Sequence, residues 1–158
     1  MSMLQKLGRF VVGGKDAVED PSEVLIQAHA DAVERMLLLQ QHAEMSPQEY
    51  SRTGLQALAE AARAQVDSLR TTLRERGLRV PPEPPALASG GSVNHWARLV
   101  QDLERHRSSS RKLRELAVQF ADSQPSVASF LDQLCQQDLR ACERLRALIA
   151  RADPQAAA

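Results

Sequence analysis

GLRVPPEPPALASGGS, residues 77–92, is the stretch that decides the fold. It holds four of the chain's eight prolines. Proline has no amide hydrogen, and its ring clashes with the preceding helical turn, so this stretch is expected to be stiff and extended rather than helical. An extended chain of this length spans up to about 50 Å, and a helix of about 30 residues is about 45 Å long. The stretch can therefore run the whole length of a helical bundle.

Apolar residues three and four positions apart predict helices on both sides of this crossover, because that spacing places them on one helix face. The four predicted helices cover about residues 22–45, 47–76, 93–122 and 126–152. The breaks within each pair are very short, so each pair is expected to form an antiparallel hairpin. The predicted fold is an all-α, antiparallel four-helix bundle of two helical hairpins joined by the long Pro-rich crossover.

Helix-capping residues mark several of these ends. Ser22 and Ser46 are suitable N-caps, because a hydroxyl accepts a hydrogen bond from the first helical turn. Glu49, three residues after Ser46, completes a capping box. Ser92 is the expected cap of the third helix, and Gly77 is a natural stop for the second.

The bundle accounts for residues 22–152 and leaves a segment at each end. Residues 1–21 are an N-terminal leader, and residues 153–158 are a C-terminal tail. The leader is expected to pack against the bundle, with docking to a partner as the alternative. Its short apolar run lacks the long core and the small-residue cleavage site of a signal peptide.

The composition excludes several classes of function. Twenty basic and twenty acidic residues balance in a chain of 158, so no general attraction to nucleic acid or to an anionic membrane is expected. No run of about 20 apolar residues is present to form a membrane span. Cys135 and Cys142 are about 10 Å apart along one predicted helix, which is too far for a disulfide bond. Without a disulfide framework, a cytoplasmic location is expected.

Two segments carry a resemblance to a known family. LQALAEAARAQVDSLRTTLRERG, residues 55–77, resembles the second helix of ferritin-like proteins. SFLDQLCQQDLRACERLRALIARA, residues 129–152, resembles their fourth helix. Two helical hairpins joined by a long crossover is also the ferritin-like arrangement. The resemblance covers residues 22–152 in architecture, and its motifs are leucine spacings.

The resemblance implies a bundle in which the second and fourth helices each carry Glu-x-x-His and hold two iron or manganese ions. It places Ala62 and Gln65 at the glutamate and histidine positions of the second helix. It places Asp138 and Ala141 at those of the fourth. A di-metal centre carries about four positive charges and is very unfavourable to bury without carboxylates. The family's metal centre is therefore expected to be lost.

The first and third helices offer imidazoles instead of the family's acidic residues. His29 or Ala32 on the first helix, and His106 on the third, are the inward positions nearest to this level. If an atypical iron or zinc site exists, its expected ligands are His29, Gln65, His106 and Asp138. Otherwise Asp138 is expected to pair with a histidine or an arginine of a neighbouring helix, since a buried carboxylate needs a partner.

A zinc site is also conceivable on the fourth helix. Cys135, Asp138 and Cys142 share one helix face, and His106 can approach them from the third helix. Thiolate, imidazole and carboxylate are zinc ligands, although a tetrahedral site favours closer spacing than two turns. Buried cysteines in helical cores usually act as small hydrophobic residues, and that role is expected here.

The segment ERHRSSSRKLRE, residues 104–115, is locally basic. It can contact phosphates or an acidic partner, but Glu104 and Glu115 balance part of its charge, so a solvated helix face is expected. No Gly-rich phosphate loop, H-E-x-x-H motif or nucleophile elbow occurs in the sequence. A nucleic-acid-associated role is the third and least favoured possibility.

The expected function is a non-catalytic, structural or protein-interaction module without a cofactor. Self-association as a homodimer is expected because the first helix is apolar beyond one stripe, and such a helix needs two surfaces to bury against. The residues that widen this stripe are Ile26, Val33, Leu37 and Leu38. The alternative is a metal-binding protein with an atypical di-iron or zinc site, acting in oxidation or metal storage.

Overall fold

The structure, a computed structural model, describes residues 19–85 and 94–152. The helices in these ranges are α2 (Pro21–Met45), α3 (Glu49–Glu75), α4 (His95–Phe120) and α5 (Pro125–Arg151). Residues 19–85 and 94–152 contain no strand, so the all-α prediction is confirmed. Each helix begins and ends within two residues of its predicted limits. The expectations for the leader and the tail lie outside the described residues.

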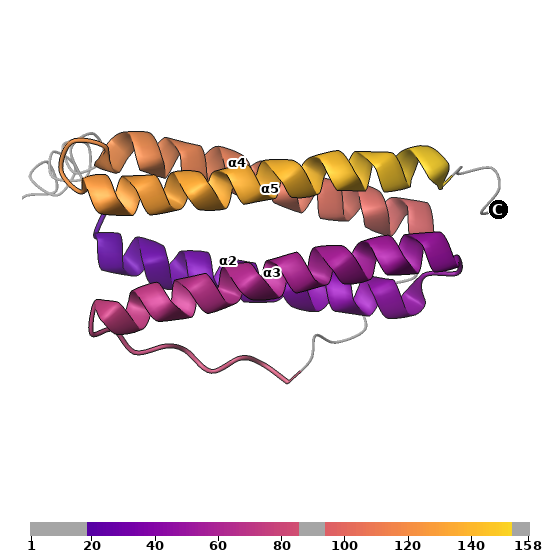
Figure 1. Cartoon of the computed structure of the whole chain (residues 1–158), viewed down its shortest axis with the longest axis horizontal. Helices are drawn as coiled ribbons and strands as arrows, with labels where there is room; N and C mark the ends of the chain where they lie inside the picture. Colours follow the sequence, from indigo (N-terminus) through magenta and orange to yellow (C-terminus); the bar gives the residue numbers. More distant parts are fainter. Residues whose placement is uncertain (1–18, 86–93, 153–158) are drawn as a thin grey trace, which may run out of the picture.

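The helices pack in two close pairs, α2 with α3 and α4 with α5, and the pairs make fewer contacts with each other. In Figure 1 the α4–α5 pair lies above the α2–α3 pair, and all four helices run roughly along the long axis of the molecule. In the same view α3 ends at the left-hand end of the molecule, and α4 begins at the right-hand end. The connection between them therefore joins opposite ends of the bundle.

The predicted N-caps of the first two helices are wrong. Asp20, rather than Ser22, caps α2, and its carboxylate accepts a hydrogen bond of 2.9 Å from the Ser22 amide. Ser46 and Glu49 form no capping box, because Ser46 ends α2 and cannot also begin α3. The Ser46 hydroxyl instead donates to the Gln48 carbonyl at 3.1 Å. Gln48 then precedes α3 without a side-chain cap.

The predicted stop of α3 at Gly77 is confirmed. Gly77 has a φ of 69°, a conformation that costs glycine little because it has no Cβ. Its amide donates to the Arg74 carbonyl at 2.9 Å, and the Leu78 amide donates to the Leu73 carbonyl at 2.9 Å. This is the Schellman arrangement of hydrogen bonds, which satisfies the last carbonyls of a helix.

At the start of α4, the Asn94 side chain accepts a hydrogen bond of 2.8 Å from the Ala97 amide. Asn94 is therefore the N-cap, and the predicted cap, Ser92, lies outside the described residues. Asparagine serves as well as serine at this position.

The core is built mainly from leucines of all four helices. Its largest fully buried side chains include Leu25, Met36, Leu55, Leu69, Leu99, Phe120, Leu131 and Leu145. The first part of the crossover also belongs to it, because Leu78 and Val80 pack against the core. Burying such a leucine contributes about 1.5–3 kcal/mol, so these residues supply most of the driving force for folding.

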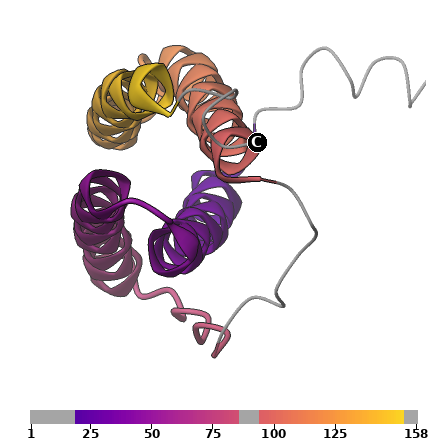
Figure 2. The same ribbon diagram turned by 90° about the vertical axis from the view of Figure 1, so that its right-hand side faces the viewer.

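The crossover is further held to α3 by charge. Figure 2 shows its described part passing outside the α2–α3 pair. Glu83 accepts a hydrogen bond of 2.6 Å from Arg63 and lies 3.5 Å from Arg70. The hydrogen bond from Arg63 lowers the pKa of Glu83 below its ordinary value.

The extra apolar residues of α2 are covered to different degrees. Val33 is only 4% exposed, and Ile26 and Leu37 are partly buried against the core. Leu38 is also partly buried. The homodimer therefore stays a prediction, since three of these four side chains keep part of their surface exposed. None of the helices described in Figure 1 is long and apolar enough to cross a bilayer.

Candidate functional site

The middle of the bundle contains a buried polar cluster to which each helix contributes one side chain. We call it the Arg35 cluster, and its members are Arg35 of α2, Gln65 of α3, Ser109 of α4 and Asp138 of α5. Arg35 Nη2 lies 3.5 Å from Gln65 Oε1 and 3.9 Å from Asp138 Oδ2. The Gln65 amide also donates to the Leu134 carbonyl at 3.4 Å. Arg35 therefore connects three of the four helices.

The guanidinium of Arg35 is buried but loosely held. Arg35 is 8% exposed, and its Nε atom has no hydrogen-bond partner among residues 19–85 and 94–152. Its contacts to Gln65 and Asp138 are both longer than the 2.7–2.9 Å typical of a charge-assisted hydrogen bond. A guanidinium offers five N–H donors, and here the Nε donor is unused and Nη2 makes only these long contacts.

Asp138 is held more tightly than Arg35. It is 2% exposed, and one of its carboxylate oxygens accepts a hydrogen bond of 2.5 Å from the Ser109 hydroxyl. The prediction that Asp138 pairs with an arginine or a histidine of a neighbouring helix is confirmed for Arg35. The serine partner was not predicted.

His106 lies next to this cluster and is buried. It is 4% exposed, and its Nδ1 atom donates to the Asp102 carbonyl at 2.8 Å. Burial lowers the pKa of His106 below its ordinary value, and the hydrogen bond to Asp102 and the charge of Asp138 oppose this effect. His106 and Asp138 thus interact electrostatically without a direct bond between them in the structure.

His29 belongs to a different environment. It is 1% exposed, and neither ring nitrogen has a hydrogen-bond partner in the described part of the chain. Burial lowers its pKa, as does the positive charge of Arg70, while Glu83 of the crossover raises it. The charged neighbours of His29 are thus those of the crossover side of the bundle. His29 is therefore not grouped with the other candidate ligands, Gln65, His106 and Asp138, around one point.

The residues present do not fit a metal centre. The described residues contain no group of three or more His, Cys, Asp or Glu side chains arranged to hold a metal ion. Arg35 places a positive charge 3.9 Å from Asp138, where a metal ion would be repelled. Gln65, the other candidate at this level, is engaged by Arg35 and by the Leu134 carbonyl.

The cysteines of α5 are no better suited to zinc. Both are buried free thiols, and the Cys135 thiol donates to the Ser110 carbonyl at 3.2 Å. Burial raises the pKa of the Cys142 thiol, which disfavours the thiolate that zinc requires. Both side chains are packed in the hydrophobic core, as expected for cysteines acting as small hydrophobic residues.

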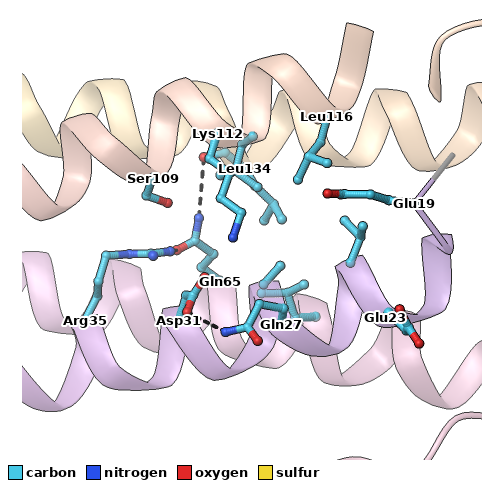
Figure 3. Close-up of a pocket in the computed structure, with 14 residues that line it drawn as sticks. Glu19, Glu23, Gln27, Asp31, Arg35, Gln65, Ser109, Lys112, Leu116 and Leu134 are labelled. Carbon is cyan, nitrogen blue, oxygen red and sulfur yellow. Dashed lines mark hydrogen bonds between the residues drawn. The ribbon is translucent and has the colours of Figure 1, made fainter. Parts of the chain in front are cut away.

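A cavity of about 290 Å³ opens between α2 and α4, beside the Arg35 cluster. We call it the α2–α4 cavity. Its apolar wall is formed mainly by Val24, Leu69, Leu113, Leu116 and Leu134. Arg35, Gln65 and Ser109 line its polar end, and Figure 3 shows the Arg35 side chain running along α2 toward Gln65.

The rim of the α2–α4 cavity carries charges of both signs. Glu19, Glu23 and Asp31 line the α2 side, and Lys112 lines the α4 side. Figure 3 shows Lys112 reaching from α4 into the space above α2. Asp31 accepts a hydrogen bond of 2.9 Å from the Gln27 amide. The cavity therefore has an apolar wall, two cationic side chains, Arg35 and Lys112, and three carboxylates.

A second buried polar cluster lies between the C-terminal end of α2 and the N-terminal half of α4. We call it the Asp102 cluster, and its members are His42, His95, Asp102 and Arg105. His42 Nδ1 lies 2.6 Å from Asp102 Oδ2, and Arg105 Nη1 lies 3.4 Å from the other carboxylate oxygen. Burial lowers the pKa of His95, as do the nearby charges of Arg98 and His42, while the negative charge of Asp102 raises it. Arg105 lines a second, shallower pocket together with Arg35 and Lys112.

Sequence reasoning missed Arg35, Ser109, His42 and Asp102, which are two of the four members of each cluster. A signal for two of them is present, because Ala32, Arg35, Leu39 and His42 follow one another at spacings of three and four. That spacing places Arg35 and His42 on the buried stripe of α2. Reading the stripe without regard to residue polarity would have found them.

No protein-family model, curated protein or solved structure matches this chain. The site is therefore interpreted from its own residues.

Proposed function

We propose that the chain is a non-catalytic, ferritin-like bundle of two antiparallel helical hairpins that serves as a structural or protein-interaction module. The observation that supports this proposal best is the Arg35–Asp138 pair at the middle of the bundle, with 3.9 Å between Nη2 and Oδ2. A guanidinium there supplies positive charge from the protein itself. The single acidic residue that the resemblance retains is thereby compensated without a metal ion.

The Arg35 cluster also explains how the two helix pairs stay in register. Its members come from all four helices, and the His42–Asp102 contact adds a second polar level between α2 and α4. A hydrogen bond to a charged group contributes about 1.5–3 kcal/mol when both partners are well placed. Polar groups at fixed levels of a bundle favour one alignment over those shifted by a turn.

Metal analysis of the full chain tests the non-catalytic part of the proposal. The protein is purified without chelators, incubated with Fe(II) or Zn(II), desalted and measured by inductively coupled plasma mass spectrometry. Far less than one metal ion per chain is expected, because Arg35 repels a cation next to Asp138. The Asp138→Ala variant serves as the matched control and is expected to give the same value.

Stoichiometric metal in the wild-type protein that is lost in Asp138→Ala would overturn this proposal. It would establish the alternative, an atypical metalloprotein acting in oxidation or metal storage. Metal bound equally by both proteins points to surface carboxylates or a purification tag, and it leaves the Arg35–Asp138 pair as the occupant of the bundle's middle.

Self-association is supported by the zero formal net charge of the chain, since proteins near neutrality associate more readily. Within residues 19–85 and 94–152, four large hydrophobic side chains are exposed: Met45, Tyr50, Val118 and Leu139. Val118 is the most exposed of them at 73%. Light scattering after size-exclusion chromatography is expected to show a dimer that Val118→Lys weakens. A monomer at every concentration tested would contradict self-association.

A further inference from the structure

We propose that the α2–α4 cavity binds a small amphipathic molecule with one carboxylate, which Arg35 holds while the hydrocarbon part lies along the leucine wall. This inference goes beyond the structural role proposed above, because it assigns a ligand class to a site inside the bundle. Binding at this site and the metal content of the protein are measured independently, so either proposal can fail alone.

The first argument is the state of Arg35. A buried charge is costly unless it is paired and hydrogen-bonded, yet the contacts of Arg35 to Gln65 and Asp138 measure 3.5 and 3.9 Å. Its Nε atom is enclosed and bonded to nothing in the described residues. The planar guanidinium is shaped to bind a carboxylate through two parallel hydrogen bonds. A ligand carboxylate in the cavity would supply acceptors to the terminal nitrogens of Arg35, of which Nη2 makes only long contacts to Gln65 and Asp138.

The second argument is why Asp138 does not already meet this need. Its carboxylate is engaged by the Ser109 hydroxyl at 2.5 Å and stands 3.9 Å from the guanidinium. Asp138 therefore offsets part of the charge of Arg35 without using its donors. It is also absent from the residues that line the cavity, whereas Arg35 and Ser109 are among them. The donors of Arg35 remain available from the cavity side.

The third argument is the size and lining of the cavity. Its volume of about 290 Å³ lies near the lower end of the range for small-molecule sites. The wall residues Leu69, Leu113, Leu116 and Leu134 are otherwise buried, so a hydrocarbon chain would complete their packing. Apolar pockets with a few converging polar groups are the usual form of such sites. The arrangement specifies a polar head at Arg35 and an apolar tail.

The fourth argument concerns the charge of the ligand. Glu19, Glu23 and Asp31 also line the cavity and repel anions, and Lys112 on the α4 side offsets only part of this. A phosphate ester, with up to two negative charges, is opposed more strongly than a monocarboxylate. A cation is attracted to these carboxylates but repelled by Arg35 and Lys112. A ligand with one negative charge can pair with Arg35 and meets the least repulsion from the carboxylates.

The test uses ligands with the same ten-carbon tail and different heads. Decanoate, 1-decanol, decyl phosphate and decyltrimethylammonium are titrated into the full wild-type chain by isothermal titration calorimetry. Decanoate is expected to bind at one molecule per chain and about tenfold or more tightly than each of the others, since a charge-assisted pair of hydrogen bonds is worth about that factor. Equal affinity for decanol, or tighter binding of the phosphate or the cation, would overturn the proposal.

Two variants locate the site. Arg35→Met is expected to lower decanoate affinity about tenfold or more while leaving decanol unchanged, and Arg107→Met is its control because Arg107 is an exposed arginine of α4 outside the cavity. Ala28→Phe fills the cavity and is expected to abolish binding of the tail. Its control is Ala30→Phe on the exposed face of α2.

Decanoate binding that neither Arg35→Met nor Ala28→Phe changes would place the ligand elsewhere and refute the assignment. Circular dichroism is recorded for each variant. If Arg35→Met does not fold, Arg35→Lys takes its place, because it keeps the charge and loses the two-pronged geometry; a smaller but measurable loss of decanoate affinity is then expected. The comparison of the four ligands on the wild-type chain requires no variant at all.

Discussion

The two buried polar clusters differ in how completely their charges are satisfied. In the Asp102 cluster, His42 lies 2.6 Å from the carboxylate, and Arg105 approaches its other oxygen at 3.4 Å. In the Arg35 cluster, the guanidinium is 3.5 Å from Gln65 and 3.9 Å from Asp138. Both clusters connect α2 to α4, but the members of the second that line the α2–α4 cavity are Arg35, Gln65 and Ser109, whereas no member of the first lines it. A carboxylate held at short distance fixes structure, whereas a loosely held guanidinium beside a cavity has capacity left for a ligand.

The comparison predicts that the Asp102 cluster matters more for stability. Replacing Asp102 with alanine leaves His42 and Arg105 without their carboxylate, and breaking a buried pair costs about 3–5 kcal/mol. Urea denaturation followed by circular dichroism measures this loss. Asp132→Ala, at an exposed aspartate of α5, is the control and is expected to change the free energy of unfolding by less than about 0.5 kcal/mol.

The equivalent change in the Arg35 cluster is expected to cost less. Asp138→Ala removes the acceptor of Ser109 and the nearest negative charge to Arg35. Because the Arg35 contact is long, the loss is expected to be about 1–3 kcal/mol, the cost of leaving polar groups unsatisfied. The same urea titration applies. If Asp138→Ala destabilises the protein as much as Asp102→Ala, the Arg35 cluster is not held more loosely than the Asp102 cluster.

The pH dependence of stability is expected to be a smaller effect shared by both regions. Burial lowers the pKa of His95 in the Asp102 cluster, of His106 beside the Arg35 cluster, and of His29 under the crossover. Below the ordinary histidine pKa of about 6.5, the unfolded chain therefore binds protons that the folded chain does not. Stability is full above that pH and decreases as the pH falls from 6.5 toward the lowered values.

Urea midpoints at pH 7.5 and 5.5 measure this decrease. His95→Phe is expected to reduce it, because neither ring nitrogen of His95 has a hydrogen-bond partner in the described residues and phenylalanine does not titrate. A midpoint that rises on acidification would contradict the direction of these three shifts.

The limits of sequence-based prediction follow from the same residues. Gly77 was identified because the conformation it adopts depends on one residue type in a local turn. Ser46 was assigned wrongly because two helix ends compete for it, and the sequence does not show which end uses its backbone. The helices themselves were found because their periodicity is long and regular.

The candidate site depended on contacts that are distant in sequence. Arg35 and Asp138 are about a hundred positions apart, and the sequence around each has the pattern of an ordinary amphipathic helix. The environment of His29 is set by the path of the crossover, through Glu83. Asp138 was expected to find a basic partner because burial requires one, but its identity depends on how the two helix pairs face each other.

The difference between the two clusters is tested most directly by a double variant of the Arg35 cluster that we expect to leave stability nearly unchanged. Replacing a buried ion pair by apolar residues of similar size is often neutral or stabilising, because the cost of removing two charges from water disappears. Arg35→Met combined with Asp138→Leu is therefore expected to unfold within about 1 kcal/mol of the wild-type chain. In the Asp102 cluster, His42→Leu with Asp102→Leu is the matched control, and it is expected to remain clearly destabilised because Arg105 and His95 lose their neighbour.

A large loss of stability in the Arg35→Met, Asp138→Leu protein would show that the Arg35 pair is a structural bond of the bundle. Near-neutral stability would mean that folding alone does not require a buried arginine at the end of a cavity. The presence of the arginine would then be explained by ligand binding. Loss of decanoate affinity in this well-folded double variant would show that the Arg35 cluster binds the ligand.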